Sequence, residues 1–179
     1  MSIKRKSKRA SLAIRILAPG ECSATDLQSF VRLVCQGAQV TSVGLEARIA
    51  SATWLGFAWS GEKLAGVAAL KNPRPTYRSK VFSAAKAAAL AQRFPLEFGW
   101  TVVVPECRGL GIAKTLLREL LAKNASSGTF ATTSTDNQSM QKILRDSGFE
   151  VLGEPFPSPR KETNNCLWGH SRSSGLEVM

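Results

Sequence analysis

The segment Val102-Val-Val-Pro-Glu-Cys-Arg-Gly-Leu-Gly-Ile-Ala113 joins a run of β-branched residues to an amphipathic stretch through a turn that holds Gly109 and Gly111. Backbone N–H groups at such a strand-to-helix turn can converge on an anion, and the helix dipole adds about half a positive charge there. The pattern therefore favours a cradle for a pyrophosphate. A Gly-Leu-Gly turn before a helix also occurs as ordinary turn chemistry, and both interpretations stay open on these residues alone.

Two other nucleotide-binding loops are excluded by the residues of this turn. A dinucleotide fingerprint requires Gly or Ala three positions after the second glycine, and this chain has Lys114 there. A phosphate loop of the form GxxxxGK[ST] occurs nowhere in the sequence. A shorter pyrophosphate loop and a neutral turn remain.

The composition is that of one globular domain. The chain has 179 residues, 44% hydrophobic and 21% charged, which is enough for a real core. No apolar run approaches the roughly 18 residues of a membrane span, so we expect a soluble, cytoplasmic protein without membrane contact. Four cysteines without CxxC spacing and a single histidine, His170, argue against a zinc site or a disulfide framework. We therefore expect no metal.

The net charge of +11 is unevenly distributed. Six cations lie in the first fifteen residues, where there is no acid. We interpret residues 1–10 as a disordered basic tail. Such a tail can serve solubility alone, or it can bind nucleic acid or another acidic partner.

Outward from the glycine turn, alternation and helical periodicity predict a mixed α/β sheet in one domain, residues 11–170, with a second disordered tail at 171–179. The helix near Thr25–Gly37 is expected to start with a capping box at Thr25–Gln28, and a later one with a box at Thr135–Gln138. The expected strands are Ser11–Pro19, Trp54–Ser60, Lys63–Leu70, Leu96–Val104 (buried on both faces), Thr129–Ser134, Phe149–Gly153 and Asn165–His170, the last two separated by prolines. The other expected helices are Ser42–Ser51, Ser79–Arg93 and Ile112–Asn124.

Two motifs together resemble one known family. Arg108-Gly-Leu-Gly-Ile-Ala113 follows a predicted strand, and Asn137 precedes a short helix that ends in Gly148-Phe149. Motifs and spacing are similar to those of the GNAT N-acetyltransferase superfamily from about Leu12 to His170. The resemblance implies the GNAT fold, a mixed and mostly antiparallel sheet with splayed fourth and fifth strands, and acetyl-CoA as the co-substrate.

The same resemblance assigns the residues that bind the donor. The backbone of Thr101, Val102 and Val103 would pair with the pantetheine arm. Asn137 would contact the CoA arm, and Arg108 or Lys114 would screen phosphate charge, although Lys114 is equally typical of a solvated helix face. The amides expected to hold the pyrophosphate belong to Gly109, Leu110, Gly111, Ile112, Ala113 and Lys114.

Catalysis requires a base, because a lysine-type amine titrates near 10.4 and must lose a proton before it attacks a thioester. Glu97, eleven residues before Arg108, is the candidate, since several family members have a base glutamate there. The alternative is an ion-paired or exposed carboxylate at a strand end. A backbone N–H around Val103 would stabilise the oxyanion.

One departure from the family concerns the general acid. Many members have a tyrosine seven residues after the motif asparagine, and this chain has Leu144 there. Ser139, Cys166, His170 or solvent could substitute, and His170 is also typical of a polar strand end. Cys107, beside the cradle, is interpreted as a turn residue.

We therefore predict an N-acetyltransferase that moves an acetyl group from acetyl-CoA to a primary amine by direct attack. The acceptor stays open: a small molecule, a protein amine or a nucleic-acid-borne amine such as aminoacyl-tRNA. The alternative is an acyl-CoA-binding module without turnover. We expect the segment Arg74–Phe94 to shape the acceptor side, and either a monomer or a homodimer.

Overall fold

The computed structural model describes residues 12–37, 40–124, 127–159 and 162–171. The predicted tails, residues 1–10 and 171–179, lie outside these ranges apart from Ser171. The helices are α1 (Ala24–Gln36), α2 (Leu45–Ala50), α3 (Pro75–Ala84), α4 (Ile112–Lys123) and α5 (Gln138–Asp146), with short 3-10 turns at Pro19–Glu21, Ala88–Arg93 and Pro105–Cys107. The strands are β1 (Leu12–Leu17), β2 (Trp54–Ser60), β3 (Lys63–Lys71), β4 (Leu96–Val103), β5 (Thr129–Ser134), β6 (Glu150–Pro157) and β7 (Asn164–His170).

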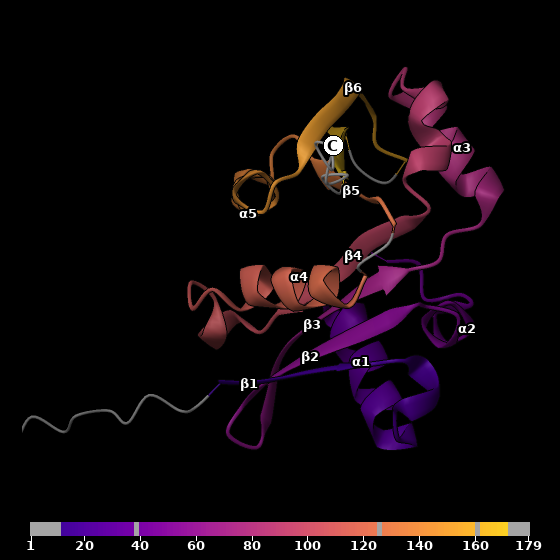
Figure 1. Ribbon diagram of the computed structural model, residues 1–179. Helices are drawn as coiled ribbons and strands as arrows, with labels where there is room; N and C mark the ends of the chain where they lie inside the picture. Colours follow the sequence, from indigo (N-terminus) through magenta and orange to yellow (C-terminus); the bar gives the residue numbers. More distant parts are fainter. Residues whose placement is uncertain (1–11, 38–39, 125–126, 160–161, 172–179) are drawn as a thin grey trace, which may run out of the picture.

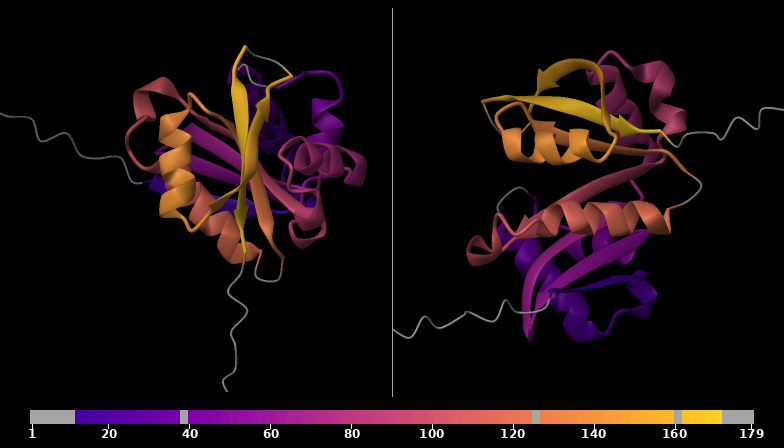
Figure 2. Two further views of the ribbon diagram at one scale, coloured as in Figure 1. Left: turned by 90° about the horizontal axis from the view of Figure 1, so that it is seen from above. Right: turned by 60° about the vertical axis from the view of Figure 1, so that its left-hand side comes forward.

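One sheet contains all seven of these strands, in the order β1-β2-β3-β4-β5-β7-β6. Neighbours are antiparallel except β4 and β5, which run parallel. Only three residue pairs join those two strands, Leu96–Phe98 against Thr129–Ala131. Beyond them the strands diverge, so β1–β4 and β5–β7 form two layers joined at the start of β4 (Figures 1 and 2). The predicted mixed sheet with splayed fourth and fifth strands is confirmed.

Helices cover both faces of the β1–β4 layer, because each has one apolar stripe at helical spacing. Helix α4 packs Leu116, Leu117 and Leu120 against one face. Helix α1 packs Phe30 and Val34 against the other (Figure 1). The core on each side of β3 therefore holds this layer rigid beside the divergence.

Both predicted capping boxes are wrong by two residues. Helix α1 is capped by Ser23, whose hydroxyl accepts from the Asp26 amide at 3.1 Å while the Asp26 carboxylate accepts from the Ser23 amide. Helix α5 is capped by Asn137. Serine and asparagine are stronger N-caps than threonine, and each helix begins at the stronger of its two nearby caps.

The predicted helix Ser79–Arg93 is also wrong in its bounds. Pro75 starts α3 four residues earlier, as a proline at the first helical position can. The helix stops at Ala84, because Lys86 has a left-handed φ of 56° and the chain continues as the 3-10 turn Ala88–Arg93. Buried Ala85 and Ala87 fit the aromatic cluster beneath, and this tertiary packing overrides the local helix propensity of an alanine-rich stretch.

The last two strands extend further than the prolines suggested. Strand β6 continues through Pro155 and Pro157, with an irregularity in its pairing between Leu152 and Phe156. It is an edge strand, where a missing N–H costs no ladder bond.

Within the described ranges, no helix combines the length and the apolar character that crossing a membrane requires. No three His, Cys, Asp or Glu side chains of these ranges gather as a metal site would require.

Candidate functional site

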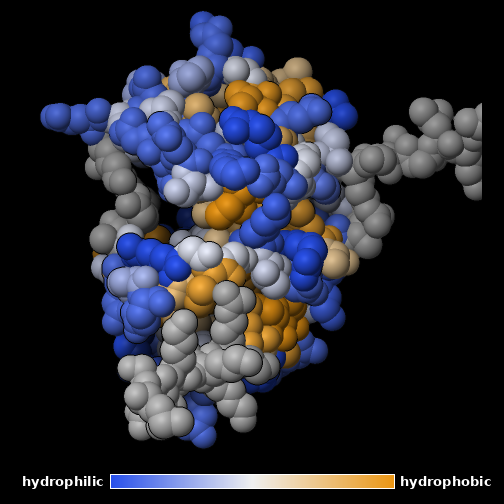
Figure 3. Space-filling view, turned by 90° about the vertical axis from the view of Figure 1, so that its left-hand side faces the viewer, coloured by the Kyte–Doolittle hydropathy of each residue, from blue (hydrophilic) through white to orange (hydrophobic). Residues whose placement is uncertain are grey.

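A cavity of about 1470 Å³ opens where β4 and β5 diverge. Its walls come from α2, the end of β3, the second half of β4, the turn before α4, and α5. The space-filling view shows the surface hollowed between the two layers (Figure 3). Ligand pockets usually measure about 300–1,000 Å³, so this cavity has room for a long donor molecule together with an acceptor.

The glycine turn forms one end of the cavity, the cradle end. Gly109 and Gly111 have left-handed φ values of 77° and 76°, and no atom lies within 4 Å of where a Cβ would stand. The first backbone bond of α4 runs from the Thr115 amide to the Gly111 carbonyl, at 3.0 Å. The amides before Thr115 therefore stand at the unpaired N-terminus of a helix, which suits an anion. Among the predicted cradle residues, Gly109, Gly111, Ile112, Ala113 and Lys114 line the cavity, whereas Leu110 is 64% exposed and does not.

The open edge of β4 forms the middle of the cavity. Thr101, Val102 and Val103 line it and are half-buried, so the expected burial of this strand on both faces is wrong beyond Phe98. The Val104 amide donates to the Ala65 carbonyl of β3 at 2.9 Å. Because N–H directions alternate along a strand, the Val103 amide faces the opposite edge, which β5 leaves unpaired.

Two further features mark this open edge as irregular. Trp100 has a left-handed φ of 50° where the β3–β4 register shifts. The Thr101 hydroxyl is buried and has no hydrogen-bond partner among the described residues. An orphaned buried hydroxyl costs free energy, so a ligand group lying along β4 would satisfy it. The open edge, the orphaned hydroxyl and the cradle together fit an acyl-CoA.

The three side chains predicted to contact the donor each have a protein partner. Arg108 donates from Nε to the Val103 carbonyl at 3.2 Å, which fixes the guanidinium at the end of β4. The Asn137 carbonyl oxygen accepts from the Met140 amide at 3.1 Å as the cap of α5. Lys114 reaches Asp146 at 3.4 Å. Hydrogen bonds from Lys142 and Lys114 hold the pKa of Asp146 below its usual value.

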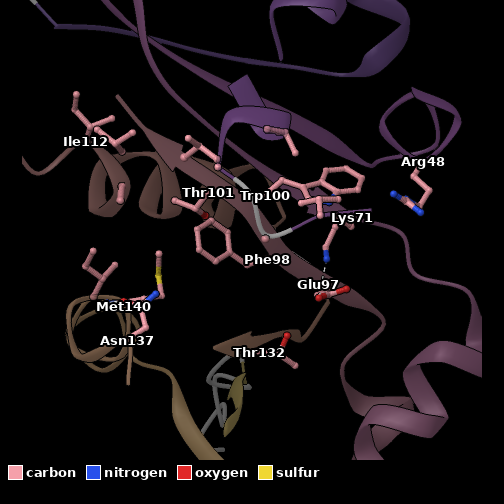
Figure 4. Close-up of a pocket in the computed structure, with 18 of the residues that line it drawn as sticks. Arg48, Lys71, Glu97, Phe98, Trp100, Thr101, Ile112, Thr132, Asn137 and Met140 are labelled. Atoms are coloured by element: carbon pink, nitrogen blue, oxygen red, sulfur yellow. Dashed lines mark hydrogen bonds and ion pairs between the residues drawn. The ribbon is translucent and has the colours of Figure 1, made fainter. Parts of the chain in front are cut away.

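Glu97 lies at the other end of the cavity, the acceptor end, and is 4% exposed. Its carboxylate is 2.7 Å from the ammonium of Lys71, the residue directly opposite in β3 (Figure 4). It also accepts a hydrogen bond from the Tyr77 hydroxyl at 3.3 Å. The alternative interpretation of Glu97 as an ion-paired carboxylate is therefore observed. The pairing does not remove the carboxylate from the cavity, so its role as a base stays a prediction.

Sequence reasoning predicted Glu97 and the segment Arg74–Phe94 for the acceptor side and missed Lys71 and Arg48. Lys71, Arg48 and Arg74 line the cavity there, and the Lys71 ammonium lies 5.3 Å from the centre of the Trp100 ring. The signal for Lys71 was its position directly after the predicted strand Lys63–Leu70, because β3 includes it and β4 brings Glu97 alongside. Nothing local identified Arg48. The first residues of the segment Arg74–Phe94 do line the cavity, whereas its later aromatic residues pack into the core.

Leu144 and the three side chains that could replace it as the general acid lie in different places. Leu144 is buried in the core. Ser139 lines the cavity, whereas Cys166 and His170 do not. Burial raises the pKa of the Cys166 thiol and lowers the pKa of His170. Tyr77, the only tyrosine of the chain, lines the acceptor end instead.

Solved structures of other proteins share this fold. Escherichia coli ElaA superposes with a TM-score of 0.67 at 12% identity, covering 90% of this chain and 100% of that one. An acyl-CoA N-acyltransferase from Pseudomonas aeruginosa gives 0.66 at 13% identity, with coverage of 90% and 100%. The structure of yncA from Salmonella typhimurium with its cofactor acetyl-CoA gives 0.61 at 14% identity, with coverage of 92% and 96%.

At these identities the structural likeness establishes the fold alone. No curated protein sequence matches the chain. The sequence profile described as the Acetyltransferase (GNAT) family matches residues 36–149. That match spans more than half of the chain and includes the cradle, the open edge of β4 and Asn137, and the chain therefore belongs to the GNAT acetyltransferase family.

Proposed function

We propose that this protein transfers an acetyl group from acetyl-CoA to a primary amine by direct attack in a ternary complex. The observation that carries the proposal is that one continuous cavity joins two groups. The cradle residues line it at one end, and the buried carboxylate of Glu97 lines it at the other. Family membership and a neighbour solved with acetyl-CoA support the choice of donor.

The donor would lie along the cavity from the cradle to the open edge of β4. The amides of residues 109–114 would bind the diphosphate, helped by the cations of Arg108 and Lys114. The backbone of Thr101–Val103 would pair with the pantetheine arm as a short added strand. When bound, acetyl-CoA supplies an acyl carbon activated as a thioester.

Glu97 would take the proton that the amine must lose. The N–C bond would then form, with the Val103 amide stabilising the oxyanion. The C–S bond would break to release the thiolate, and the nitrogen of the new amide would lose its remaining excess proton to solvent. A thiol with a pKa near 8.5 leaves tolerably without an acid, and the proton held by Glu97 passes to it through solvent. Lys71 and Tyr77 hold the carboxylate in one orientation toward the cavity.

The test combines calorimetric titration with acetyl-CoA and detection of free thiol in the presence of an amine panel. Glu97→Gln keeps the shape of the side chain and removes the base. We expect kcat to fall by about 10²–10⁴-fold, with acetyl-CoA affinity changed less than about twofold. Glu62→Gln, in the exposed turn between β2 and β3, is the matched control and should behave as the wild type. Failure of the wild type to bind acetyl-CoA would end the proposal.

The alternative function, a binding module without turnover, is favoured by the ion pair that occupies Glu97. Acetyl-CoA binding without thiol release across the whole panel would support it. Thiol release that depends on Glu97 would exclude it.

A further inference from the structure

The charges that line the cavity are strongly unbalanced. Its lining includes six basic side chains and two acidic ones: Arg48, Lys71, Arg74, Arg108, Lys114 and Lys142 against Glu97 and Asp146. The imbalance exists at both ends. Three of the cations, Arg108, Lys114 and Lys142, lie at the cradle end, where the phosphates of the donor supply the opposite charge. The other three need a different explanation.

At the acceptor end only one cation is matched within the protein. Lys71 pairs with Glu97. In the part of the chain that the structure describes, no carboxylate lies within ion-pair distance of Arg48 or Arg74. Two guanidinium groups therefore line this end without an anion of their own.

The fold restrains the two exposed arginines in different ways. Arg48 donates to the Thr41 carbonyl at 2.6 Å, and Figure 4 shows its guanidinium projecting from α2 on the side of the cavity where Lys71 and Trp100 lie. Arg74 precedes α3 and stands between Pro73 and Pro75. Pro75 restricts the residue before it to an extended backbone, and Arg74 has φ -56° and ψ 138°, so the direction in which its side chain leaves the backbone is fixed.

We infer that the acceptor carries a carboxylate a few atoms from the amine that is acetylated. The amine lies against Glu97, and the carboxylate is bound by Arg48 and Arg74, whose planar groups bind carboxylates with two parallel hydrogen bonds. This inference rests on the proposed function and narrows its substrate class. A free amino acid and a peptide whose amine lies beside an acidic residue share this chemistry.

The arrangement fits a carboxylate better than a nucleic acid. Nucleic-acid binding relies on many phosphate contacts along an extended basic surface. Here only two arginines at one end of a cavity lack a carboxylate partner among the described residues, since Lys71 is already paired with Glu97. A zwitterion, with one positive and one negative group, matches both charges.

The experiment compares matched acceptors. One arm uses free L-amino acids, each beside its carboxamide, and a second uses the amidated peptides Asp-Ala-Ala and Asn-Ala-Ala. The wild-type enzyme should prefer the carboxylate member by about tenfold in kcat/KM, the effect of one good charged contact. Amine reactivity would favour the carboxamides, because a neighbouring carboxylate makes an amine hold its proton more tightly. The expected preference therefore reports recognition of the acid.

The variant Arg48→Gln/Arg74→Gln should lose this preference through a higher KM for the acidic acceptor, with KM for acetyl-CoA changed less than about twofold. Lys80→Gln removes an exposed cation of α3 that does not line the cavity, and it should keep the preference. Preference in the amino-acid arm alone identifies a small-molecule acceptor, and preference in the peptide arm identifies a protein one.

Equal rates for carboxylate and carboxamide in the wild type would overturn the inference and leave the proposed function intact. So would a preference that survives in the double variant, or turnover of aminoacyl-tRNA alone with a steep loss between about 50 and 200 mM salt. If no amine releases thiol although acetyl-CoA binds, the proposed function and the inference fail together.

Discussion

The two ends of the cavity are built in different ways. The cradle end uses the backbone of a few consecutive residues, 109–114, at the start of α4. The acceptor end uses the side chains of Arg48, Lys71, Arg74 and Glu97, which come from or directly precede four different elements. A backbone site depends on conformation and tolerates many side chains, whereas a side-chain site depends on identity. The first can stay the same while the second changes, which would let one fold keep its donor and exchange its acceptor.

The largest effect that separates the two ends is expected at Gly111. Gly111→Glu puts a like charge where the diphosphate would lie and forces a side chain into a left-handed φ of 76°. We expect acetyl-CoA affinity to fall by at least about 100-fold, because opposed like charges cost several kcal/mol. Calorimetric titration with acetyl-CoA measures this loss of affinity.

Gly61→Glu is the control for strain. Gly61 has a φ of 61° and equally open surroundings, but it lies in the turn between β2 and β3. The Gly61→Glu variant should lose about as much stability as Gly111→Glu and keep its full affinity for acetyl-CoA. Equal weakening of acetyl-CoA binding in both variants would show that strain, and not the cradle, explains the result.

A second contrast compares one ion pair at each end. Lys71→Met leaves the buried carboxylate of Glu97 without its partner at 2.7 Å. We expect a loss of about 2 kcal/mol in the free energy of unfolding, less than for a fully buried pair because Lys71 is partly exposed.

Lys114→Met breaks the longer and more exposed pair with Asp146 at the cradle end. Exposed pairs contribute little, and Lys142 still reaches Asp146, so stability should hardly change. Urea denaturation of both variants measures the difference. An equal loss of stability in Lys114→Met and Lys71→Met would contradict this expectation.

The contrast also explains what the sequence predicted well. The hairpin of β2 and β3 was predicted because two apolar stretches flank the short turn Ser60-Gly61-Glu62. The glycine turn was predicted because Gly109 and Gly111 are local requirements of backbone conformation. A turn or a hairpin is set by neighbouring residues, so its position can be predicted from a short stretch of sequence.

The two capping boxes and the start of α3 at Pro75 failed for local reasons, because a stronger N-cap or a proline lay a few residues away. The other predictions that failed depend on contacts between distant parts of the chain. The C-terminal end of α3 follows from burial of Ala85 and Ala87 against the aromatic cluster. The partner of Glu97 follows from the register of β3 against β4. Arg48 reaches the cavity from a six-residue helix that only the fold brings there. No spacing along the sequence encodes such contacts, so Arg48, Lys71 and the pairing of Glu97 emerged only from the structure.

The smallest expected effect concerns a group that belongs to neither end. His170 in β7 lies beside the Phe149 ring, with centroids 5.2 Å apart, and burial lowers its pKa from the model-compound value of 6.5. The unfolded chain therefore takes up the proton first as the pH falls. The resulting loss of stability is absent well above pH 6.5 and grows as the pH falls through the folded-state pKa.

Urea denaturation at pH 7.5, 6.0 and 5.0 should show a steeper loss for the wild type than for His170→Gln, which has no proton to take up there. The difference is small because His170 is partly exposed. Acetyl-CoA affinity of the two proteins should be equal at each pH, because His170 does not line the cavity. Parallel stability profiles would mean that the imidazole titrates alike in both states. A difference in acetyl-CoA affinity between the wild type and His170→Gln would instead show that β7 is coupled to the cavity. The two ends would then no longer be the only determinants of acetyl-CoA binding.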